Sequence, residues 1–216
     1  MKKSSKASFA HVLWVGGATD AGKTTVAQLL GKRYNWQTYH YDHHSHGYLE
    51  KKAETEQLYR EFLAATNNDR WVQPDVRELL QFALHSFRSS FPLVLDDLRQ
   101  FSTQQIVVAE GFGLLPELVF PLLADKVQAV WLVPTPNFKW ASMTRRNKPS
   151  FKNDTSDPEK ATQNLYERDM LIAEEVAKQA SERALNLYEI DGLKSAEDMT
   201  DVIAQQFQQY LHSLTS

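Results

Sequence analysis

The chain has 216 residues, 42% of them hydrophobic, which is enough for one domain with a full core. Its net charge of -3 gives no electrostatic footprint for non-specific nucleic-acid binding, and no apolar run reaches the length of a membrane span. The absence of cysteine excludes disulfides and thiolate metal sites and fits a reducing cytoplasm.

The N-terminus begins with Met1, Lys2 and Lys3, which resembles the basic start of a signal peptide. The apolar run that follows is short and leads directly into a glycine motif, which cleavage there would destroy. We therefore expect no signal peptide, and we expect the polar segment 1–8 to fray.

The first strong motif is a phosphate-binding loop. Gly17, Gly22, Lys23 and Thr24 fit the pattern G-x-x-x-x-G-K-[ST], with a β-type run before them and a helical pattern over 23–34 after them. The backbone N–H groups of such a loop wrap a phosphate, and the helix presents its positive end to the same anion. The residues predicted to contact nucleotide are Gly17, Ala18, Thr19, Asp20, Ala21, Gly22, Lys23, Thr24 and Thr25.

A second strand is predicted within 35–42, and it ends at Asp42. Because ligands of open α/β sheets bind at the carboxyl ends of strands, Asp42 should lie on the same rim as the phosphate loop. His43, His44 and His46 come next, and three histidines beside an aspartate could bind zinc. Their spacing matches no common zinc pattern, so lining of a polar substrate pocket is favoured, with a solvated loop as the alternative.

The segment 43–100 is predicted to be a helical substrate lobe. Its predicted helices are 51–65, about 75–89 and 93–101, with a break at 67–69. The core-facing residues of the second helix are Val76, Leu79, Leu80, Ala83 and Phe87. Charged residues of the third, Asp96, Asp97 and Arg99, are interpreted as a solvated face.

The run from Gln105 ends at Glu110 and has the continuous β-branched character of a strand buried in a parallel sheet. Glu110 could hold Mg²⁺ directly or through water, or hold a substrate hydroxyl. The alternative is that it caps a short helix near 114–123. Gly111 and Gly113 would let the backbone come close to a ligand.

The remaining predicted elements are a strand at 127–133, helices at 137–146, 158–183 and 195–211, and a last strand at 187–190. The stretch 147–158 has almost no apolar residues and is predicted to be a mobile lid, within a lid region of 140–168. Arg145 and Arg146 enter it, and would stabilise a transferring phosphoryl group or satisfy carbonyls at the helix end. Arg168 is interpreted as solvated or paired with acidic neighbours.

Five strands alternating with helices predict an α/β fold with a parallel sheet. The phosphate loop after the first strand, an acid after the second, Ala109-Glu110-Gly111-Phe112-Gly113 after the third and an arginine-bearing lid before the fifth resemble the P-loop nucleoside and small-molecule kinases, near shikimate, gluconate and chloramphenicol kinases. This resemblance implies a three-layer P-loop fold with sheet order 2-3-1-4-5, an adenine pocket near the exit of the last strand, and a substrate lobe between strands two and three. Glu110-Gly111-Phe112 looks like the Asp-Gly-Phe-Pro of nucleotide kinases, with Glu for Asp and Gly113 for Pro.

The sequence therefore predicts a single-domain kinase over 1–216 that uses ATP and Mg²⁺ and phosphorylates a hydroxyl of a sugar, nucleoside or antibiotic-like molecule. The predicted catalytic residues are Lys23, Asp42, Arg145 and Arg146, and the predicted metal ligands are Thr24 and Glu110. Lys23 would reach the β- and γ-phosphates, and Asp42 would orient and deprotonate the acceptor hydroxyl.

Two other functions stay open at this point: a P-loop ATPase or nucleotide-binding switch without an acceptor, and a toxin-like kinase of a sugar nucleotide. A GTPase is disfavoured because Asn147-Lys148-Pro149-Ser150 lacks the aspartate of the guanine-reading Asn-Lys-x-Asp. No nucleic-acid or membrane partner is expected, and the chain is expected to be a monomer or homodimer.

Overall fold

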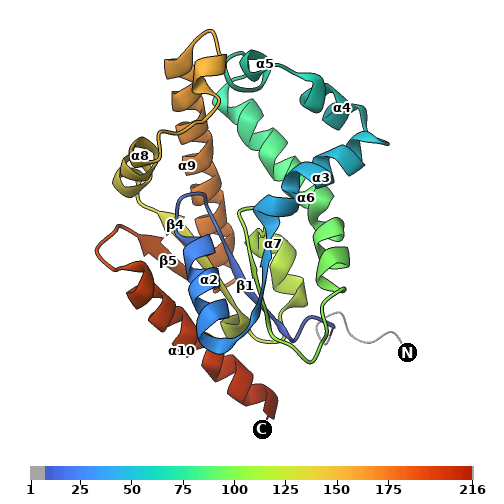
Figure 1. Ribbon diagram of the computed structural model, residues 1–216, viewed down its shortest axis with the longest axis vertical. Helices are drawn as coiled ribbons and strands as arrows, with labels where there is room; N and C mark the ends of the chain where they lie inside the picture. Colours follow the sequence, from blue (N-terminus) through green and yellow to red (C-terminus); the bar gives the residue numbers. More distant parts are fainter. Residues whose placement is uncertain (1–7, 216) are drawn as a thin grey trace.

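A parallel five-stranded sheet forms the centre of the computed structural model, which describes residues 8–215 (Figure 1). Its strands are β1 (Val12–Gly17), β2 (Gln37–His40), β3 (Val107–Glu110), β4 (Ala129–Pro134) and β5 (Asn186–Ile190). They lie in the order β2-β3-β1-β4-β5, and every neighbouring pair is parallel. The predicted fold class and strand order are confirmed, whereas the expectations for Met1 to Lys3 and for fraying up to residue 7 lie outside the described residues.

Helices cover both faces of the sheet because side chains of successive strand residues point to opposite sides. In β1, Val12 and Trp14 belong to the core on one face, and Leu13 and Val15 belong to the core on the other. The first core is covered by α6 (Val76–Leu98), α7 (Pro116–Val119) and α9 (Pro158–Glu182), and the second by α2 (Lys23–Tyr34) and α10 (Ala196–Thr215). The result is the predicted three-layer arrangement.

The other helices lie beyond the carboxyl ends of the strands, at the top of Figure 1. They are α3 (Tyr41–Ala53), α4 (Gln57–Ala64), α5 (Asn67–Trp71) and α8 (Pro136–Arg145). Three short 3-10 turns complete the described part of the chain: η1 (Phe120–Leu122), η2 (Lys126–Gln128) and η3 (Lys152–Asp154). Within residues 8–215, no helix is both long enough and apolar enough to cross a membrane.

The second strand is shorter than predicted, because it ends at His40 and α3 begins at Tyr41. The prediction of a strand that ends at Asp42 was therefore wrong, and so was the alternative of a solvated loop at His43, His44 and His46. Tyr41 and Tyr48 are both buried, so one face of this segment packs in the core as a helix. Asp42 lies in the first helical turn, where a carboxylate is favoured by the helix dipole.

The predicted helix boundaries between 51 and 101 were also wrong. Segment 51–65 belongs to two helices, α3 and α4, and the predicted break at 67–69 is the start of α5, where Thr66 and Asp69 form a capping box. The two helices predicted from 75 to 101 are one continuous α6 that includes Pro92. Proline removes one helical hydrogen bond, but burial of the neighbouring Phe91 and Val94 in the core keeps the helix intact.

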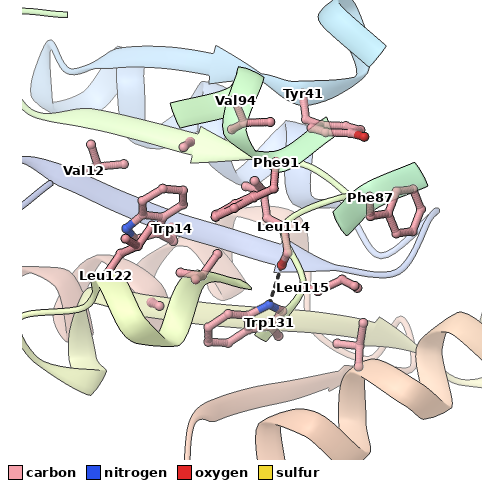
Figure 2. Close-up of a cluster of buried hydrophobic side chains, with 14 of the residues drawn as sticks. Val12, Trp14, Tyr41, Phe87, Phe91, Val94, Leu114, Leu115, Leu122 and Trp131 are labelled. Carbon is pink, nitrogen blue, oxygen red and sulfur yellow. Dashed lines mark hydrogen bonds between the residues drawn. The ribbon is translucent and has the colours of Figure 1, made fainter. Parts of the chain in front are cut away.

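The chain after β3 is fixed by a tryptophan in the core (Figure 2). Trp131 on β4 is fully buried, and its Nε1–H donates a 2.8 Å hydrogen bond to the Leu114 carbonyl oxygen. Gly16 makes this contact possible, since a Cβ there would lie 2.3 Å from Trp131 Nε1. The predicted helix at 114–123 is only α7 followed by η1, because this pinned loop takes up its first two residues.

Replacing Trp131 tests how much this contact contributes to stability. Trp131→Phe removes the buried donor, leaves the Leu114 carbonyl without its partner and opens a small cavity, so we expect a loss of about 2–4 kcal/mol in the free energy of unfolding. Trp140→Phe is the matched control, because Trp140 is 49% exposed, and it should cost below about 0.5 kcal/mol. Urea unfolding curves measure both, and equal midpoints for the two variants would contradict the expectation.

Candidate active site

The phosphate loop joins β1 to α2 and depends on left-handed backbone conformations. Gly17 and Gly22 have φ of 122° and 80°, and Asp20 has φ of 62°. A Cβ at Gly17 would lie 2.0 Å from the Leu132 carbonyl oxygen on β4, so only glycine fits there. The motif glycines are therefore required by the loop geometry itself.

Lys23, the first residue of α2, lies inside this loop. Its side chain is buried, and Nζ donates a 2.6 Å hydrogen bond to the Ala18 carbonyl oxygen. Burial lowers the pKa of Lys23, while the negative charges of Glu110, Asp42 and Asp20 oppose that shift. Three carboxylates thus surround the lysine that the motif assigns to phosphate.

Glu110, the last residue of β3, lies beside Thr24. Glu110 Oε1 accepts a 3.1 Å hydrogen bond from the Thr24 hydroxyl and is 2.8 Å from His40 Nδ1, whereas the buried Oε2 has no hydrogen-bond partner in the described chain. An unpartnered buried carboxylate oxygen is costly, and a hydroxyl plus a carboxylate are the oxygen ligands that Mg²⁺ takes. These two residues fit the predicted metal site.

Asp42 lies at the same rim although it is on a helix and not at a strand end. Asp42 is exposed at the rim, but desolvation by the surrounding protein raises its pKa, the Lys23 charge lowers it and the Glu110 charge raises it again, with a raised pKa as the net result. A carboxylate with a raised pKa is a better proton acceptor than an ordinary one. The structure thus brings Asp42, Glu110 and Lys23 into one electrostatic neighbourhood.

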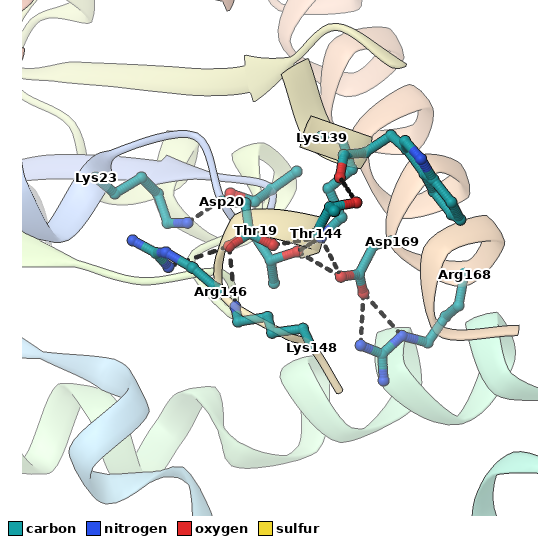
Figure 3. A network of polar contacts seen from close by, with 11 residues as sticks. Thr19, Asp20, Lys23, Lys139, Thr144, Arg146, Lys148, Arg168 and Asp169 are labelled. Atoms are coloured by element: carbon teal, nitrogen blue, oxygen red, sulfur yellow. Dashed lines mark hydrogen bonds and ion pairs between the residues drawn. The ribbon is translucent and has the colours of Figure 1, made fainter. Parts of the chain in front are cut away.

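A cluster of cations surrounds the loop residue Asp20 (Figure 3). The Asp20 carboxylate is completely buried and is 2.8 Å from Lys139 Nζ, 2.9 Å from Lys148 Nζ and 3.1 Å from Arg146 Nη1. Burial alone would raise the pKa of Asp20, but Lys139 and Lys148 lower it below its usual value. Asp20 therefore stays ionised and connects the loop to α8 and to the segment after it.

A second buried carboxylate, Asp169 on α9, extends this cluster. It accepts hydrogen bonds of 2.5 Å from both Lys139 Nζ and the Thr19 hydroxyl, and its other oxygen pairs with Arg168. Burial raises the pKa of Asp169, but Arg168 and Lys139 outweigh it and bring the value to about 2. Because the cluster holds four cations and two carboxylates, a local excess of positive charge faces the loop.

Of the two predicted lid arginines, only Arg146 reaches the loop. Arg145 is exposed and makes no hydrogen bond or ion pair within residues 8–215.

The stretch 147–158 contains η3 and contacts α5. Asn67 Nδ2 donates to Asp154 at 2.8 Å, and Phe151 stacks on Trp71 with ring centroids 4.7 Å apart. Segments far apart in the sequence thus lie side by side at the top of Figure 1.

Two cavities adjoin this constellation. The first, of about 290 Å³, lies between the loop, Phe138 on α8 and segment 188–199, which is where the adenine pocket was expected. The second, of about 140 Å³, lies between α3, α4, α5, α6 and α9, and we call it the aromatic cavity. Its aromatic lining residues are Tyr41, Phe62, Trp71, Phe82, Phe87 and Phe112.

Several neighbouring residues do not act as predicted. Among the described residues, no group of three or more histidines and acids could hold a metal, so the zinc interpretation of His43, His44 and His46 has no support. Gly111 and Gly113 were expected to let the backbone approach a ligand. Instead, both face the side chain of Tyr41, which occupies the space beside them.

Asp97 is part of the solvated face, with a side chain 38% exposed, but it also contacts a buried residue. Its carboxylate accepts a hydrogen bond from the buried Tyr48 hydroxyl, which in turn is 2.5 Å from the Tyr39 hydroxyl. Asp96 and Arg99 do form an exposed pair at 2.6 Å. One carboxylate of this acidic pair, Asp97, therefore also anchors α3 to α6.

Four functional candidates were missed from the sequence: His40, Lys139, Lys148 and Asp169. His40 pairs in register with Glu110 across β2 and β3, which the predicted strand order could have revealed. Lys139 and Asp169 lie on different helices, so nothing in either local sequence indicates that they meet. Lys148 was considered only within the guanine motif that the sequence lacks.

The fold and the loop define the class: an α/β protein with the P-loop sheet order. No family model and no curated protein matches the chain. Solved structures similar to it are shikimate kinases from Aquifex aeolicus (15% identity, TM-score 0.41, covering 95% of this chain and 99% of that one), from Bacteroides thetaiotaomicron (15%, 0.44, 93% and 98%) and, in complex with shikimate, from Acinetobacter baumannii (20%, 0.44, 97% and 98%). At these identities and TM-scores, the function proposed below rests on the geometry of the site.

The buried Asp169 should make stability depend on acidity. Its pKa falls from 3.8 to about 2 on folding, so its contribution of about 2 kcal/mol is complete above pH 4 and disappears as the pH falls through about 2. We expect Asp169→Asn to be less stable than wild type at pH 7, with the difference shrinking between pH 4 and pH 2. Unfolding free energies of both proteins across that range measure it. Asp201→Asn, at an exposed carboxylate, is the control, and a constant difference for Asp169→Asn would refute the expectation.

Proposed function

We propose that the chain is an ATP-dependent phosphotransferase that moves the γ-phosphoryl group to a hydroxyl of a small molecule. The observation that carries the proposal is the buried Glu110 carboxylate, bonded to Thr24 through one oxygen and unpartnered at the other, next to Lys23 in the phosphate loop. This donor set suits a metal-bound triphosphate better than any purely structural role, because a buried free oxygen without a ligand is unfavourable.

In this proposal, the loop residues from Gly17 to Thr25 surround the phosphates with backbone N–H groups. Mg²⁺ held by Thr24 and Glu110 would neutralise phosphate charge. Lys23 would exchange its hydrogen bond to the Ala18 carbonyl for charge-assisted hydrogen bonds to the phosphate oxygens. The cavity near segment 188–199 would take the nucleoside.

Asp42 would act on the acceptor. Its raised pKa and its place near Lys23 and Glu110 suit a group that accepts the proton of the acceptor hydroxyl as that oxygen bonds to the γ-phosphorus and the bond to the β-phosphate oxygen breaks. The aromatic cavity would take the rest of the molecule, because Tyr41 in its wall precedes Asp42 and Phe112 in its wall follows Glu110 by two residues. This cavity favours a kinase over an ATPase that lacks an acceptor.

Two cations of the lid region, Arg146 and Lys148, would balance the negative charge of the phosphates. Arg146 and Lys148 bind the buried Asp20 from the end of α8 and the segment after it, and their side chains are 54% and 37% exposed. Phosphoryl transfer needs cations around the migrating group, and these two are partly exposed beside the loop, whereas Lys139 is buried. Arg145 would reach the site only after a rearrangement, so we assign the role to Arg146 and Lys148.

Lys23→Ala tests the nucleotide site. The side chain contacts the loop, and its replacement should leave the fold intact while transfer falls by about 10²–10³-fold and ATP binding weakens. Lys32→Ala, at an exposed position on the same helix, is the matched control and should behave as wild type. ADP release with and without hydroxyl compounds, together with ATP titration, measures both. Unchanged ATP affinity and turnover in folded Lys23→Ala would refute the proposal.

The two rim acids should have separable roles. Asp42→Asn should keep near-normal ATP and Mg²⁺ binding and slow transfer by roughly 10²–10⁴-fold, the range of general acid–base catalysis. Glu110→Gln should raise the Mg²⁺ concentration needed for half-maximal turnover, because an amide binds a hard cation less well than a carboxylate. Turnover measured against Mg²⁺ concentration distinguishes them. Rescue of Asp42→Asn, but not Glu110→Gln, by excess Mg²⁺ would reverse the assignment.

A further inference from the structure

His40 occupies the junction where β2 ends and α3 begins. It is the last residue of the strand and the N-cap of the helix, with an extended backbone at φ of -111° and ψ of 103°. The parallel register pairs it with Glu110 on β3, and Glu110 pairs with Val15 on β1. Because residues in register point to the same face of a sheet, the side chains of His40 and Glu110 lie on the face of Val15, which α2 covers.

The ring of His40 is held on this face from two sides. Its side chain is only 13% exposed, and Nδ1 lies 2.8 Å from Glu110 Oε1. Nδ1 is the donor of this hydrogen bond, because an ionised carboxylate only accepts. The ring of His43, one turn along α3, packs with its centroid 5.0 Å from that of His40. Strand pairing and the first helical turn together fix the orientation of the ring.

The two oxygens of Glu110 are used unequally. Oε1 accepts from His40 Nδ1 at 2.8 Å and from the Thr24 hydroxyl at 3.1 Å, whereas Oε2 is buried and has no hydrogen-bond partner among residues 8–215. Two donors on one oxygen oppose the rotation of the carboxylate that would exchange its oxygens. His40 contributes the shorter of the two bonds, so it has the larger part in deciding which oxygen stays free.

His40 is separate from the proposed ligand set. Thr24 is a proposed ligand itself, so its hydroxyl oxygen would be shared with the cation, whereas His40 keeps its bond to Glu110. Among the described residues, no group of three or more histidines and acids could hold a metal. The route by which His40 acts on a cation therefore passes through the Glu110 carboxylate.

We propose that His40 is a positioning residue for the metal site: its Nδ1–H holds Glu110 Oε1, which leaves Oε2 available to the cation that accompanies the triphosphate. This inference rests on the proposed phosphotransferase function, because it takes Glu110 and Thr24 as the metal ligands. Hydrogen-bond partners of a ligating carboxylate orient it, and their loss typically lowers metal affinity by about 10–100-fold. A role limited to stabilising the fold would leave the metal affinity of a folded variant unchanged.

The test compares nucleotide binding with and without metal. Mn²⁺ is the probe, because it takes the same oxygen ligands as Mg²⁺. The nucleotide is the methylene analogue of ATP, in which CH₂ replaces the oxygen between the β- and γ-phosphates and prevents transfer. Calorimetry gives the dissociation constant of this analogue in EDTA and in saturating Mn²⁺. The ratio of the first constant to the second measures the coupling between metal and nucleotide on the protein.

Three substitutions of His40 separate the donor from the rest of the ring. His40→Asn places Nδ2 at the same distance along the side chain as Nδ1 and should keep the ratio close to that of wild type. His40→Ala has no donor, and His40→Gln places its donor one bond farther out, so both should lower the ratio at least about 10-fold with the EDTA constant unchanged. His46→Ala, at a side chain 73% exposed that pairs with Glu50, is the matched control and should behave as wild type. Thermal unfolding checks that each variant is folded, and the comparison of Asn with Gln keeps the test available if His40→Ala does not fold.

A double substitution tests whether His40 acts through Glu110. Glu110→Gln already removes the carboxylate from the cation, so the addition of His40→Ala should lower the ratio no further. Electron spin echo envelope modulation of the bound Mn²⁺ is a second readout, because a directly coordinated imidazole nitrogen modulates the echo strongly. The wild-type spectrum should lack that signal.

The outcomes separate this inference from the proposed function. An unchanged ratio in folded His40→Ala, a ratio in His40→Asn as low as in His40→Gln, additive losses in the double variant, or a coordinated-imidazole signal would overturn the positioning role. Transfer to a hydroxyl compound by wild type would leave the phosphotransferase intact in each of these cases. If no hydroxyl compound raises ADP release but the ratio depends on His40 as expected, the positioning role stands and the phosphotransferase is refuted. A ratio near one in wild type would overturn the metal site and this inference with it.

Discussion

The Asp20 carboxylate is the contact on which the arrangement of the site depends. It is fully buried inside the phosphate loop, and it is compensated by Lys139, Arg146 and Lys148 from α8 and the segment after it. A buried charge without partners is strongly unfavourable, so the loop and these cations must form together. Asp169 shares Lys139 and extends the same constraint to α9. The loop conformation, the helix that follows β4 and the long helix before β5 are therefore fixed by one set of charges.

The sheet supplies the second constraint. Glu110 lies at the end of β3 between β1 and β2, in register with Val15 on one side and His40 on the other. This central position buries its carboxylate and directs it to Thr24, the second residue of α2. A glutamate on the surface would be solvated by water, so a bound cation would relieve no desolvation cost there. Strand order thus converts an ordinary acidic residue into a candidate metal ligand.

The helices between β2 and β3 pack against the carboxyl ends of the strands, where Glu110 lies. Tyr41 packs against Gly111 and Gly113, so the start of α3 is held against the chain that leaves β3, and Asp42 is carried into the field of Lys23 and Glu110. The hydrogen bonds from Tyr48 to Asp97 and from Asn67 to Asp154 tie α3 to α6 and α5 to the segment after α8. The aromatic cavity lies within this framework, enclosed by elements that no single stretch of sequence brings together.

The sequence by itself determined the phosphate loop and the α/β class, because glycine spacing, β-branched runs and helical periodicity are local signals that the backbone must obey. The strand order, which the structure confirms, was implied only by the resemblance to P-loop small-molecule kinases. The sequence also indicated Glu110 and Asp42 as rim acids, since each follows a predicted strand. Only the tertiary structure decided that Asp42 lies on a helix, that Arg146 and not Arg145 approaches the loop, and that Lys139 and Asp169 form a buried pair. These features depend on contacts between residues up to 150 positions apart, as between Thr19 and Asp169, where burial and charge compensation outweigh local preference.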